Sequence, residues 1–346
     1  MGFSLFHYIM TNSRRSVSGK DGKGIFLEKE WNSMGKNVLL LVNSKSGQEK
    51  GKTFLYNIVE EFAKKNCVVT VFPILPKSKK LNTEAIVEKY KDRFDLIVCV
   101  GGDGTLHYLV NSLLHEELSV PVGYIPTGST NDFANSLGIP KDLKENIEGI
   151  VRGEPFYCDI GKLNGQYFNY IAAFGAFTKV SYGTDQGLKN NLGHMAYLLE
   201  SIRTMPESLS KSYSLKISSE ESTFSGEYIF GAIFNSRSVG GFTGFPGGTI
   251  EERLAVDLQD GEFEALLIHK PKNIADYGEI LSTIVGGDIP ENNPLVQFFK
   301  VKSMEIQAEE ELEWTLDGEF GGAYREMHVE ILERAIKVML PKKDKG

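Results

Sequence analysis

The chain has 346 residues, of which 41% are hydrophobic and 24% charged, the balance of an ordinary soluble protein. This length exceeds what one hydrophobic core usually supports, so we expect two domains. The formal net charge of −8 argues against a general nucleic-acid binder but leaves a local basic patch open, and three cysteines without CxxC spacing exclude a disulfide framework or a cysteine-based zinc site.

The first 35 residues differ from the rest of the chain in their pattern of apolar and charged residues. Apolar residues over 3–9 precede Arg14 and Arg15, which is the reverse of the order in a secretory signal. We expect an added strand over residues 3–10, an element lying on a membrane surface, or an extension without fixed structure. Elsewhere the apolar runs are strand-sized, so any contact with a membrane is expected to be peripheral.

From residue 36 onward, strands and helices alternate. Strands are predicted at residues 38–42, 68–74, 95–100 and 122–125, and helices at residues 53–65, 83–90 and 106–118. This alternation predicts an α/β domain with a parallel, doubly wound sheet covered on both faces. Ligands of such sheets bind beyond the carboxyl ends of the strands, where the loops after Val42, Val100 and Ile125 all lie.

The loop after the third strand reads Gly101-Gly102-Asp103-Gly104-Thr105. Its glycines let backbone N–H groups approach a phosphate closely, and its threonine can cap the following helix. Because a carboxylate repels phosphates, the aspartate is useful here if it holds a bridging Mg²⁺, orients an acceptor hydroxyl or caps backbone N–H groups. A plain turn between a buried strand and a helix is the alternative.

Two further loops lie at the same edge of the predicted sheet. Residues 126–134 offer hydroxyl and N–H donors for phosphates, although Ser129 and Asp132 also have the spacing of a simple capping box. Residues 46–53 resemble a Walker A loop, but Ser46 stands where glycine or alanine is required. A P-loop NTPase is therefore not favoured.

After residue 153 the pattern changes to strands separated by glycine, proline, asparagine and serine. Strands are predicted at residues 157–163, 166–174, 212–218, 228–235, 261–269, 301–308 and 328–340, with helices at 188–209 and 274–286. Alternating apolar and acidic residues over 304–316 indicate a strand with one buried face. A β-rich second domain facing the first would leave a cleft suited to a substrate.

Two acidic turns in this β-rich region are candidate sites. Gly318 makes a turn that projects Asp317 and Glu319, and a carboxylate there could remove the proton of a substrate hydroxyl during phosphoryl transfer. A surface turn is the alternative. Oxygen atoms gathered over residues 257–262 could hold a hard cation, and a metal-free hairpin turn competes with that interpretation.

Taken together, these motifs resemble the diacylglycerol kinase catalytic-domain family, in particular its bacterial soluble lipid kinases, whose relatives include sphingosine and ceramide kinases. The resemblance covers about residues 36–342, and it is the combination of motifs in this order that is specific. The matching segments are residues 43–47, 101–105, 126–132, 257–262 and 316–319.

The resemblance implies a fold and an activity. An N-terminal α/β domain over residues 36–153 binds ATP, and a C-terminal β-sandwich domain over residues 154–342, whose last segment can return to the first domain, binds the acceptor. The implied reaction is ATP- and Mg²⁺-dependent transfer of the γ-phosphoryl group to a lipid hydroxyl, with diacylglycerol giving phosphatidic acid as the foremost case. The implied setting is the cytoplasm, at the inner face of the membrane, with no nucleic-acid partner and with homodimer formation left open.

The resemblance also assigns roles to residues. Glu319 is the implied proton acceptor, Asp103 positions ATP–Mg²⁺ or the acceptor, and Asp317 belongs to the same catalytic group. A structural Mg²⁺ is implied at Asp257, Asp260 and the backbone carbonyl of Glu262. The implied ATP site comprises Asn43, Ser44, Lys45, Ser46, Gly47, Gly101, Gly102, Asp103, Gly104, Thr105, Leu106, His107, Thr127 and Gly128.

Departures from the family pattern leave alternatives open. His107-Tyr108 stands where many bacterial members have Asn-Glu, and we assign no chemical role to the histidine. The glycine-rich loop over residues 240–248 is longer than usual, which leaves the acceptor undecided. An NAD kinase-like enzyme, which also uses the GGDGT loop, and a nucleotide-sensing protein without catalysis are the competing hypotheses.

Overall fold

The computed structural model describes residues 35–43, 50–175, 211–220, 222–236, 238–239, 242–243, 257–286, 290 and 293–342. The N-terminal extension up to residue 34, the expected helix over residues 188–209 and most of the glycine-rich loop over residues 240–248 lie outside the described residues. The expected nucleotide-binding residues Ser44, Lys45, Ser46 and Gly47 lie outside them as well.

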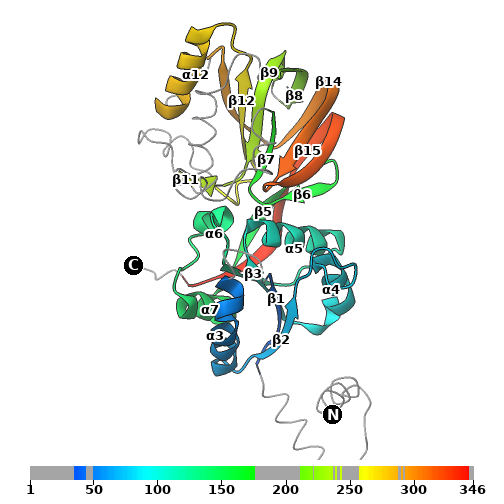
Figure 1. The fold of residues 1–346 in the computed structure, drawn as a ribbon, viewed down its shortest axis with the longest axis vertical. Helices are drawn as coiled ribbons and strands as arrows, with labels where there is room; N and C mark the ends of the chain where they lie inside the picture. The colour runs from blue at the N-terminus through cyan, green and yellow to red at the C-terminus, as the bar shows by residue number, and fades with distance from the viewer. Residues whose placement is uncertain are drawn as a thin grey trace, which may run out of the picture.

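The first part of the chain is built on four parallel strands with helices between them (Figure 1). The strands are β1 (Asn37–Val42), β2 (Val68–Pro73), β3 (Leu96–Gly101) and β4 (Val122–Pro126). The helices are α3 (Lys50–Lys64), α4 (Thr83–Tyr90), α5 (Asp103–His115), α6 (Asp132–Leu137) and α7 (Leu143–Arg152), with a 3₁₀ turn at Lys91–Arg93. The strand order is β4-β3-β1-β2, and Val42, Val100 and Ile125 are in register, so the three conspicuous loops leave the sheet at one edge.

Alternate residues of these strands pack against helices on opposite faces of the sheet. Leu39 and Leu41 of β1 belong to a core shared with α4 and α5, whereas Val38, Leu40 and Val42 belong to a second core shared with α3 and α7. Because side chains alternate along a strand, the continuous apolar run of β1 is buried on both sides.

The sequence did not predict α7. Its start is capped by Asp142, whose Oδ1 accepts a hydrogen bond from the backbone N–H of Glu145 at 2.9 Å. The helix buries Ile147 and Ile150 against the sheet. It also contacts the end of the chain, because a Cβ on Gly149 would lie 2.5 Å from Pro341.

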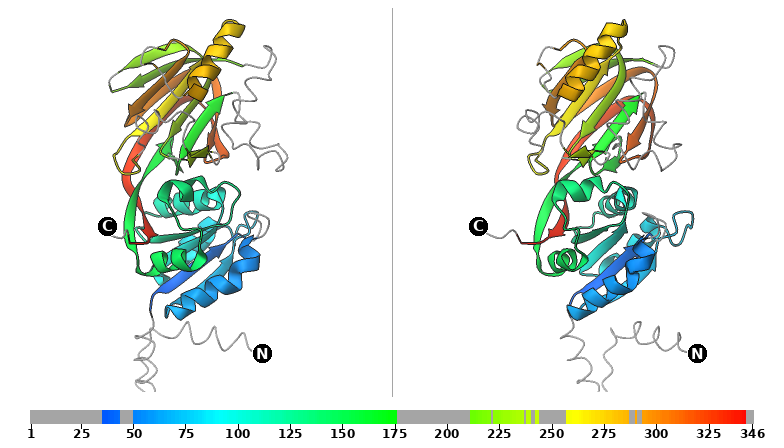
Figure 2. Two further views of the ribbon diagram at one scale, coloured as in Figure 1. Left: turned by 90° about the vertical axis from the view of Figure 1, so that its left-hand side faces the viewer. Right: turned by 60° about the vertical axis from the view of Figure 1, so that its left-hand side comes forward.

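The second part consists mainly of antiparallel strands (Figures 1 and 2). Its strands are β5 (Glu154–Leu163), β6 (Gln166–Phe168), β7 (Ile171–Gly175), β8 (Tyr213–Ser219), β9 (Thr223–Phe234), β10 (Ser238–Val239), β11 (Phe242–Thr243), β12 (Phe263–His269), β13 (Val296–Val301), β14 (Ser303–Leu316) and β15 (Glu319–Leu340). β9 and β14 each pair with β7 and with β8, so the sheet folds over on itself. The fold encloses a core around Trp314, Phe174 and Phe263, and α12 (Ile274–Gly286) covers β12 from outside through Ile280.

β15 runs through both parts of the molecule (Figure 2). Its first half pairs with β14, and its last residues pair with β5 and, through Val338, with Val122 of β4. The strand is longer than the segment predicted at residues 328–340 and begins at Glu319. One continuous strand therefore connects a candidate catalytic residue at its start to the α/β sheet near its end.

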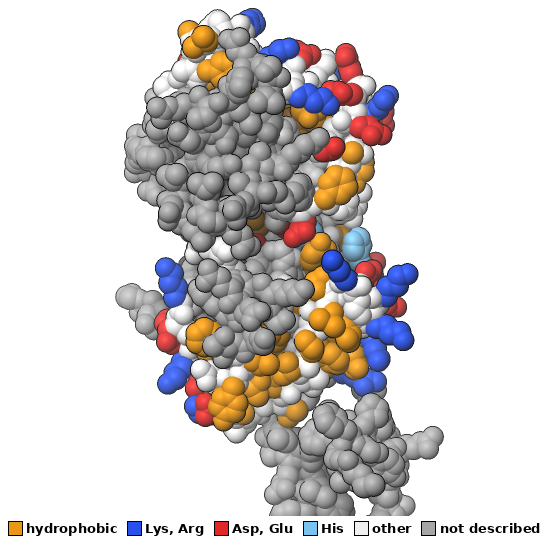
Figure 3. Space-filling model, in the orientation of Figure 1, with side chains coloured by type: hydrophobic (Ala, Val, Ile, Leu, Met, Phe, Trp, Pro, Cys, Tyr) orange, Lys and Arg blue, Asp and Glu red, His pale blue; other side chains and the backbone are white. Residues whose placement is uncertain are grey.

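In the described part of the chain, no helix combines the length and apolar character needed to cross a membrane. On the face drawn in Figure 3, the described lysine and arginine side chains are interspersed with aspartate and glutamate.

Candidate active site

The glycine loop between β3 and α5 is packed too closely for larger residues. A Cβ on Gly101 would lie 2.5 Å from the Cβ of Thr105, and a Cβ on Gly102 would lie 3.1 Å from the Cα of Gly128. The neighbouring loops are tied to it: Asn43 Nδ2 donates to Thr105 Oγ1 at 3.0 Å, and the Thr127 N–H donates to the Gly101 carbonyl at 2.8 Å. The predicted meeting of three loops is therefore present.

Asp103 contacts the loop before α6 and the first turn of that helix. Its carboxylate accepts hydrogen bonds from the Thr130 hydroxyl and from the backbone N–H groups of Asp132 and Phe133, at 3.0–3.3 Å. Of the three roles considered for this aspartate, the structure shows the capping of backbone N–H groups. The cap of α6 comes from this distant residue, whereas Asn131 at the N-cap position makes no side-chain cap bond.

Burial gives this carboxyl group an unusual acidity. Asp103 is 8% exposed, and loss of hydration, followed by the nearby charge of Asp132, raises its pKa to about 7. Its three hydrogen bonds favour the ionised form and oppose part of that rise. A group poised near neutral pH at a glycine loop is the kind of group found at functional sites.

Asp317 occupies the tip of the hairpin between β14 and β15. Asp317 and Gly318 both have positive φ, at 53° and 85°, which is the backbone of a type I′ turn and suits the Asp-Gly pair. The predicted turn is thus present, but it is not a surface turn, because the Asp317 side chain is completely buried.

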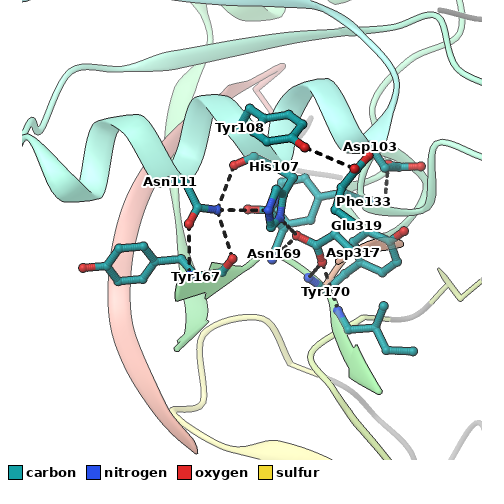
Figure 4. Close-up of polar contacts among 11 residues, drawn as sticks. Asp103, His107, Tyr108, Asn111, Phe133, Tyr167, Asn169, Tyr170, Asp317 and Glu319 are labelled. Carbon is teal, nitrogen blue, oxygen red and sulfur yellow. Dashed lines mark hydrogen bonds and ion pairs between the residues drawn. The ribbon is translucent and has the colours of Figure 1, made fainter. Parts of the chain in front are cut away.

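The Asp317 carboxylate is saturated with hydrogen bonds (Figure 4). It accepts from the backbone N–H groups of Asn169, Tyr170 and Ile171 at 2.7–3.2 Å. The Nδ1 of His107 lies 2.9 Å from its Oδ2, and because an ionised carboxylate can only accept, this nitrogen carries the hydrogen. The arrangement ties the hairpin tip to α5 and to the start of β7, and the catalytic role suggested for Asp317 stays a prediction.

Glu319, two residues further on, lies against the glycine loop. Its Oε2 accepts a hydrogen bond from the Tyr108 hydroxyl at 3.1 Å, and its Oε1 would be 2.6 Å from a Cβ on Gly104. This carboxylate is partly exposed. The start of β15 and the start of α5 are therefore in direct contact, which places the predicted proton acceptor beside the predicted phosphate loop.

Several residues of the site had no role in the sequence interpretation. Asn111 lies one helical turn after His107; its Nδ2 donates to the carbonyls of His107 and Tyr167, and its Oδ1 accepts from the Tyr167 N–H. Tyr108 and Asn111 lie on α5 close to His107, which the resemblance had placed in the ATP site, and this spacing of polar side chains on one helix is the signal that could have drawn attention to them. Leu106, in contrast, is buried in the core, so only its backbone is available to a nucleotide.

The predicted magnesium set does not form a cage in this structure. Lys300 Nζ contacts Asp260 Oδ2 at 2.9 Å. The same nitrogen lies 3.7 Å from Glu262 Oε2 and 3.6 Å from Oε1 of the buried Glu264. Asp257 is exposed, and its Oδ1 accepts a hydrogen bond from the N–H of Gln259 in the same turn. Among the described residues no three histidine, cysteine or carboxylate side chains are grouped to hold an ion. In this structure the ammonium group of Lys300 lies among these carboxylates, and the Mg²⁺ site at Asp257, Asp260 and the Glu262 carbonyl stays a prediction.

The sequence is similar to those of known diacylglycerol kinases. The family model for the diacylglycerol kinase catalytic domain matches residues 37–163. A diacylglycerol kinase of Bacillus subtilis (strain 168) is 31% identical over 310 residues, covering 89% of this chain and 97% of its own, and one of Staphylococcus saprophyticus is 30% identical over 291 residues, covering 84% and 90%.

Solved structures share the fold. One crystal structure from Bacillus anthracis str. Sterne superposes with a TM-score of 0.71 at 25% identity, covering 88% of this chain and 95% of that one. A second, described as a diacylglycerol kinase from the same organism, gives 0.65 at 23% identity, with 88% and 96% covered.

Proposed function

The chain belongs to the diacylglycerol kinase family, and from that premise we propose that it transfers the γ-phosphoryl group of ATP to the hydroxyl of diacylglycerol, giving phosphatidic acid. One observation carries the proposal: Glu319 from the β-rich part lies against Gly104 of the glycine loop. A proton acceptor for an alcohol and a loop for the donor's phosphates are thereby contiguous, as phosphoryl transfer requires.

The donor side is the edge of the parallel sheet. Family membership implies the use of ATP. We place its phosphates at the start of α5, where N–H groups of the first turn and the helix dipole favour negative charge. Gly101 and Gly102 have no room for a side chain because Thr105 and Gly128 pack against them, which keeps the loops after β3 and β4 close together. Mg²⁺ bound with ATP would neutralise charge that develops during transfer.

The acceptor side is the hairpin between β14 and β15. We assign Glu319 to take the proton of the acceptor hydroxyl, because it is the partly exposed carboxylate of the hairpin tip and touches the phosphate loop. Asp317 and His107 hold the hairpin tip onto α5 through a buried contact. The lipid substrate resides in a bilayer, so we propose that the protein acts at a membrane surface, on its cytoplasmic side.

The test is a phosphorylation assay with purified protein, Mg²⁺ and labelled ATP. The acceptors are vesicles containing diacylglycerol, sphingosine or undecaprenol, and soluble NAD. We expect label on diacylglycerol, a loss of at least a hundredfold in Glu319→Gln, and unchanged turnover in Glu326→Gln, an exposed carboxylate on the same strand. Label only on NAD would overturn the proposal, and absence of label on every acceptor would indicate a nucleotide-binding protein without turnover.

A further inference from the structure

Tyr108 is a side chain of α5 that reaches the hairpin of the β-rich part (Figure 4). It is 50% exposed, and its hydroxyl donates a hydrogen bond to Oε2 of Glu319. An aromatic residue half in water needs no such bond for its own hydration. The contact therefore calls for an explanation in terms of what it does to the glutamate.

Two neighbouring residues of one helical turn contact two residues of one hairpin tip. His107 binds the buried Asp317, and Tyr108 binds the accessible Glu319. The two rings themselves meet edge to face, with centroids 5.4 Å apart. The buried pair fixes the hairpin relative to α5, so that only the side-chain torsions of the glutamate remain to be fixed.

Tyr108 fixes the side-chain torsions of Glu319 by holding one of its two carboxylate oxygens. With Oε2 bonded to the hydroxyl, Oε1 is the oxygen that lies over Gly104. A freely rotating carboxylate would hold its oxygens at varying distances from the phosphate loop. Because reacting groups must be held within a few tenths of an ångström, restricting these rotations favours transfer.

We propose that Tyr108 is a positioning residue for phosphoryl transfer, holding Oε2 of Glu319 so that Oε1 faces the donor phosphates and receives the proton of the acceptor hydroxyl. This inference rests on the proposed function, in which Glu319 is the proton acceptor. It assigns a role to the position where the family pattern of this loop is broken in this chain.

The kinetic test compares Tyr108→Phe with Tyr56→Phe, a control at a 77% exposed tyrosine of α3. Loss of one hydrogen bond to a carboxylate is expected to lower kcat about tenfold, with KM for ATP unchanged within twofold. Tyr108→Gln, which keeps a donor, recovers part of the loss. In a Glu319→Gln background, Tyr108→Phe has no further effect. Equal effects of Tyr108→Phe with and without Glu319 would overturn the inference.

A titration tests the contact without relying on activity. Burial and the charge of Glu319 raise the pKa of Tyr108, and among the described residues the imidazole ring of His107 also meets it edge to face. Following tyrosinate absorbance, we expect one tyrosine to ionise at lower pH in Glu319→Gln than in the wild type, and this difference to vanish when Tyr108→Phe is added. Its absence would overturn the inference, whereas a wild type inactive on every alcohol would overturn the proposed function.

Discussion

The most demanding prediction concerns Gly104, where adding one methyl group is expected to lower activity without lowering stability. In Gly104→Ala the new Cβ would be 2.6 Å from Glu319 Oε1, and ordinary contact begins at 3.4 Å, so the carboxylate must retreat by about 0.8 Å. The obstacle is the end of a flexible side chain, and Gly104 is not among the residues with positive φ. The fold can therefore accept the change while the carboxylate moves.

Opposite effects on stability and rate follow. Replacing a helical glycine by alanine stabilises a protein by up to about 1 kcal/mol. Misplacing a catalytic group by nearly 1 Å costs about a hundredfold in rate, equivalent to about 2.7 kcal/mol of barrier. We expect urea unfolding to show Gly104→Ala at least as stable as the wild type, and kcat to fall about a hundredfold.

A matched control and a second variant locate the effect. Gly278→Ala places the same methyl group on α12 with nothing within 4 Å, so it is expected to stabilise without changing kcat. In a Glu319→Asp background the carboxylate is one methylene shorter, and adding Gly104→Ala is expected to cost less than tenfold. Full activity of Gly104→Ala, or a loss confined to KM for ATP, would refute the reasoning.

Three other predictions follow from the contacts of the site. In Asp317→Asn one acceptor oxygen becomes an NH₂ group, which leaves buried N–H donors unpaired, and the free energy of unfolding is expected to fall by about 3 kcal/mol. Glu319→Gln is expected to lower it by about 0.5 kcal/mol or less. Equal losses in urea unfolding would contradict a structural role for Asp317 that Glu319 does not share. Because burial raises the pKa of Asp103 to about 7, the native state keeps this proton between pH 4 and 7 while the unfolded state releases it, so stability falls as pH rises through that range. Asp103→Asn should remove up to about 1.4 kcal/mol per pH unit of this slope, and a slope unchanged from the wild type would show that the carboxyl is already ionised. Because Lys300 lies among the carboxylates of the predicted magnesium set, Mg²⁺ without nucleotide is expected to leave the unfolding temperature unchanged, and a rise of several degrees would show that an ion displaces the lysine.

Local patterns predicted the parts of the fold that depend on neighbouring residues. The apolar runs ending at Val42, Val100 and Ile125 are strands buried on both faces, and their loops meet at one edge because parallel strands share a direction. The Asp317-Gly318 turn was also predicted, since only a few residue types tolerate two positive φ angles in succession.

Pairings between distant residues could not be predicted in the same way. Asp103 caps a helix that starts 29 residues later, and Asp317 meets a histidine 210 residues before it. Neither partner leaves a trace in the spacing of its own segment, so the sequence did not reveal the contact of Asp317 with His107 or the capping of α6 by Asp103. The length of β15 was missed because its pairing changes from β14 to β5 along the strand.

The central claim is that the space between Glu319 and the donor phosphate holds the acceptor hydroxyl group. It is tested most directly by a crystal structure with Mg²⁺ and a non-hydrolysable ATP analogue. The account predicts the phosphates against residues 101–105, with Glu319 Oε1 about 5 Å from the γ-phosphorus, which leaves room for one acceptor oxygen between them. Phosphates bound elsewhere, or a γ-phosphate on the far side of α5 from Glu319, would contradict it.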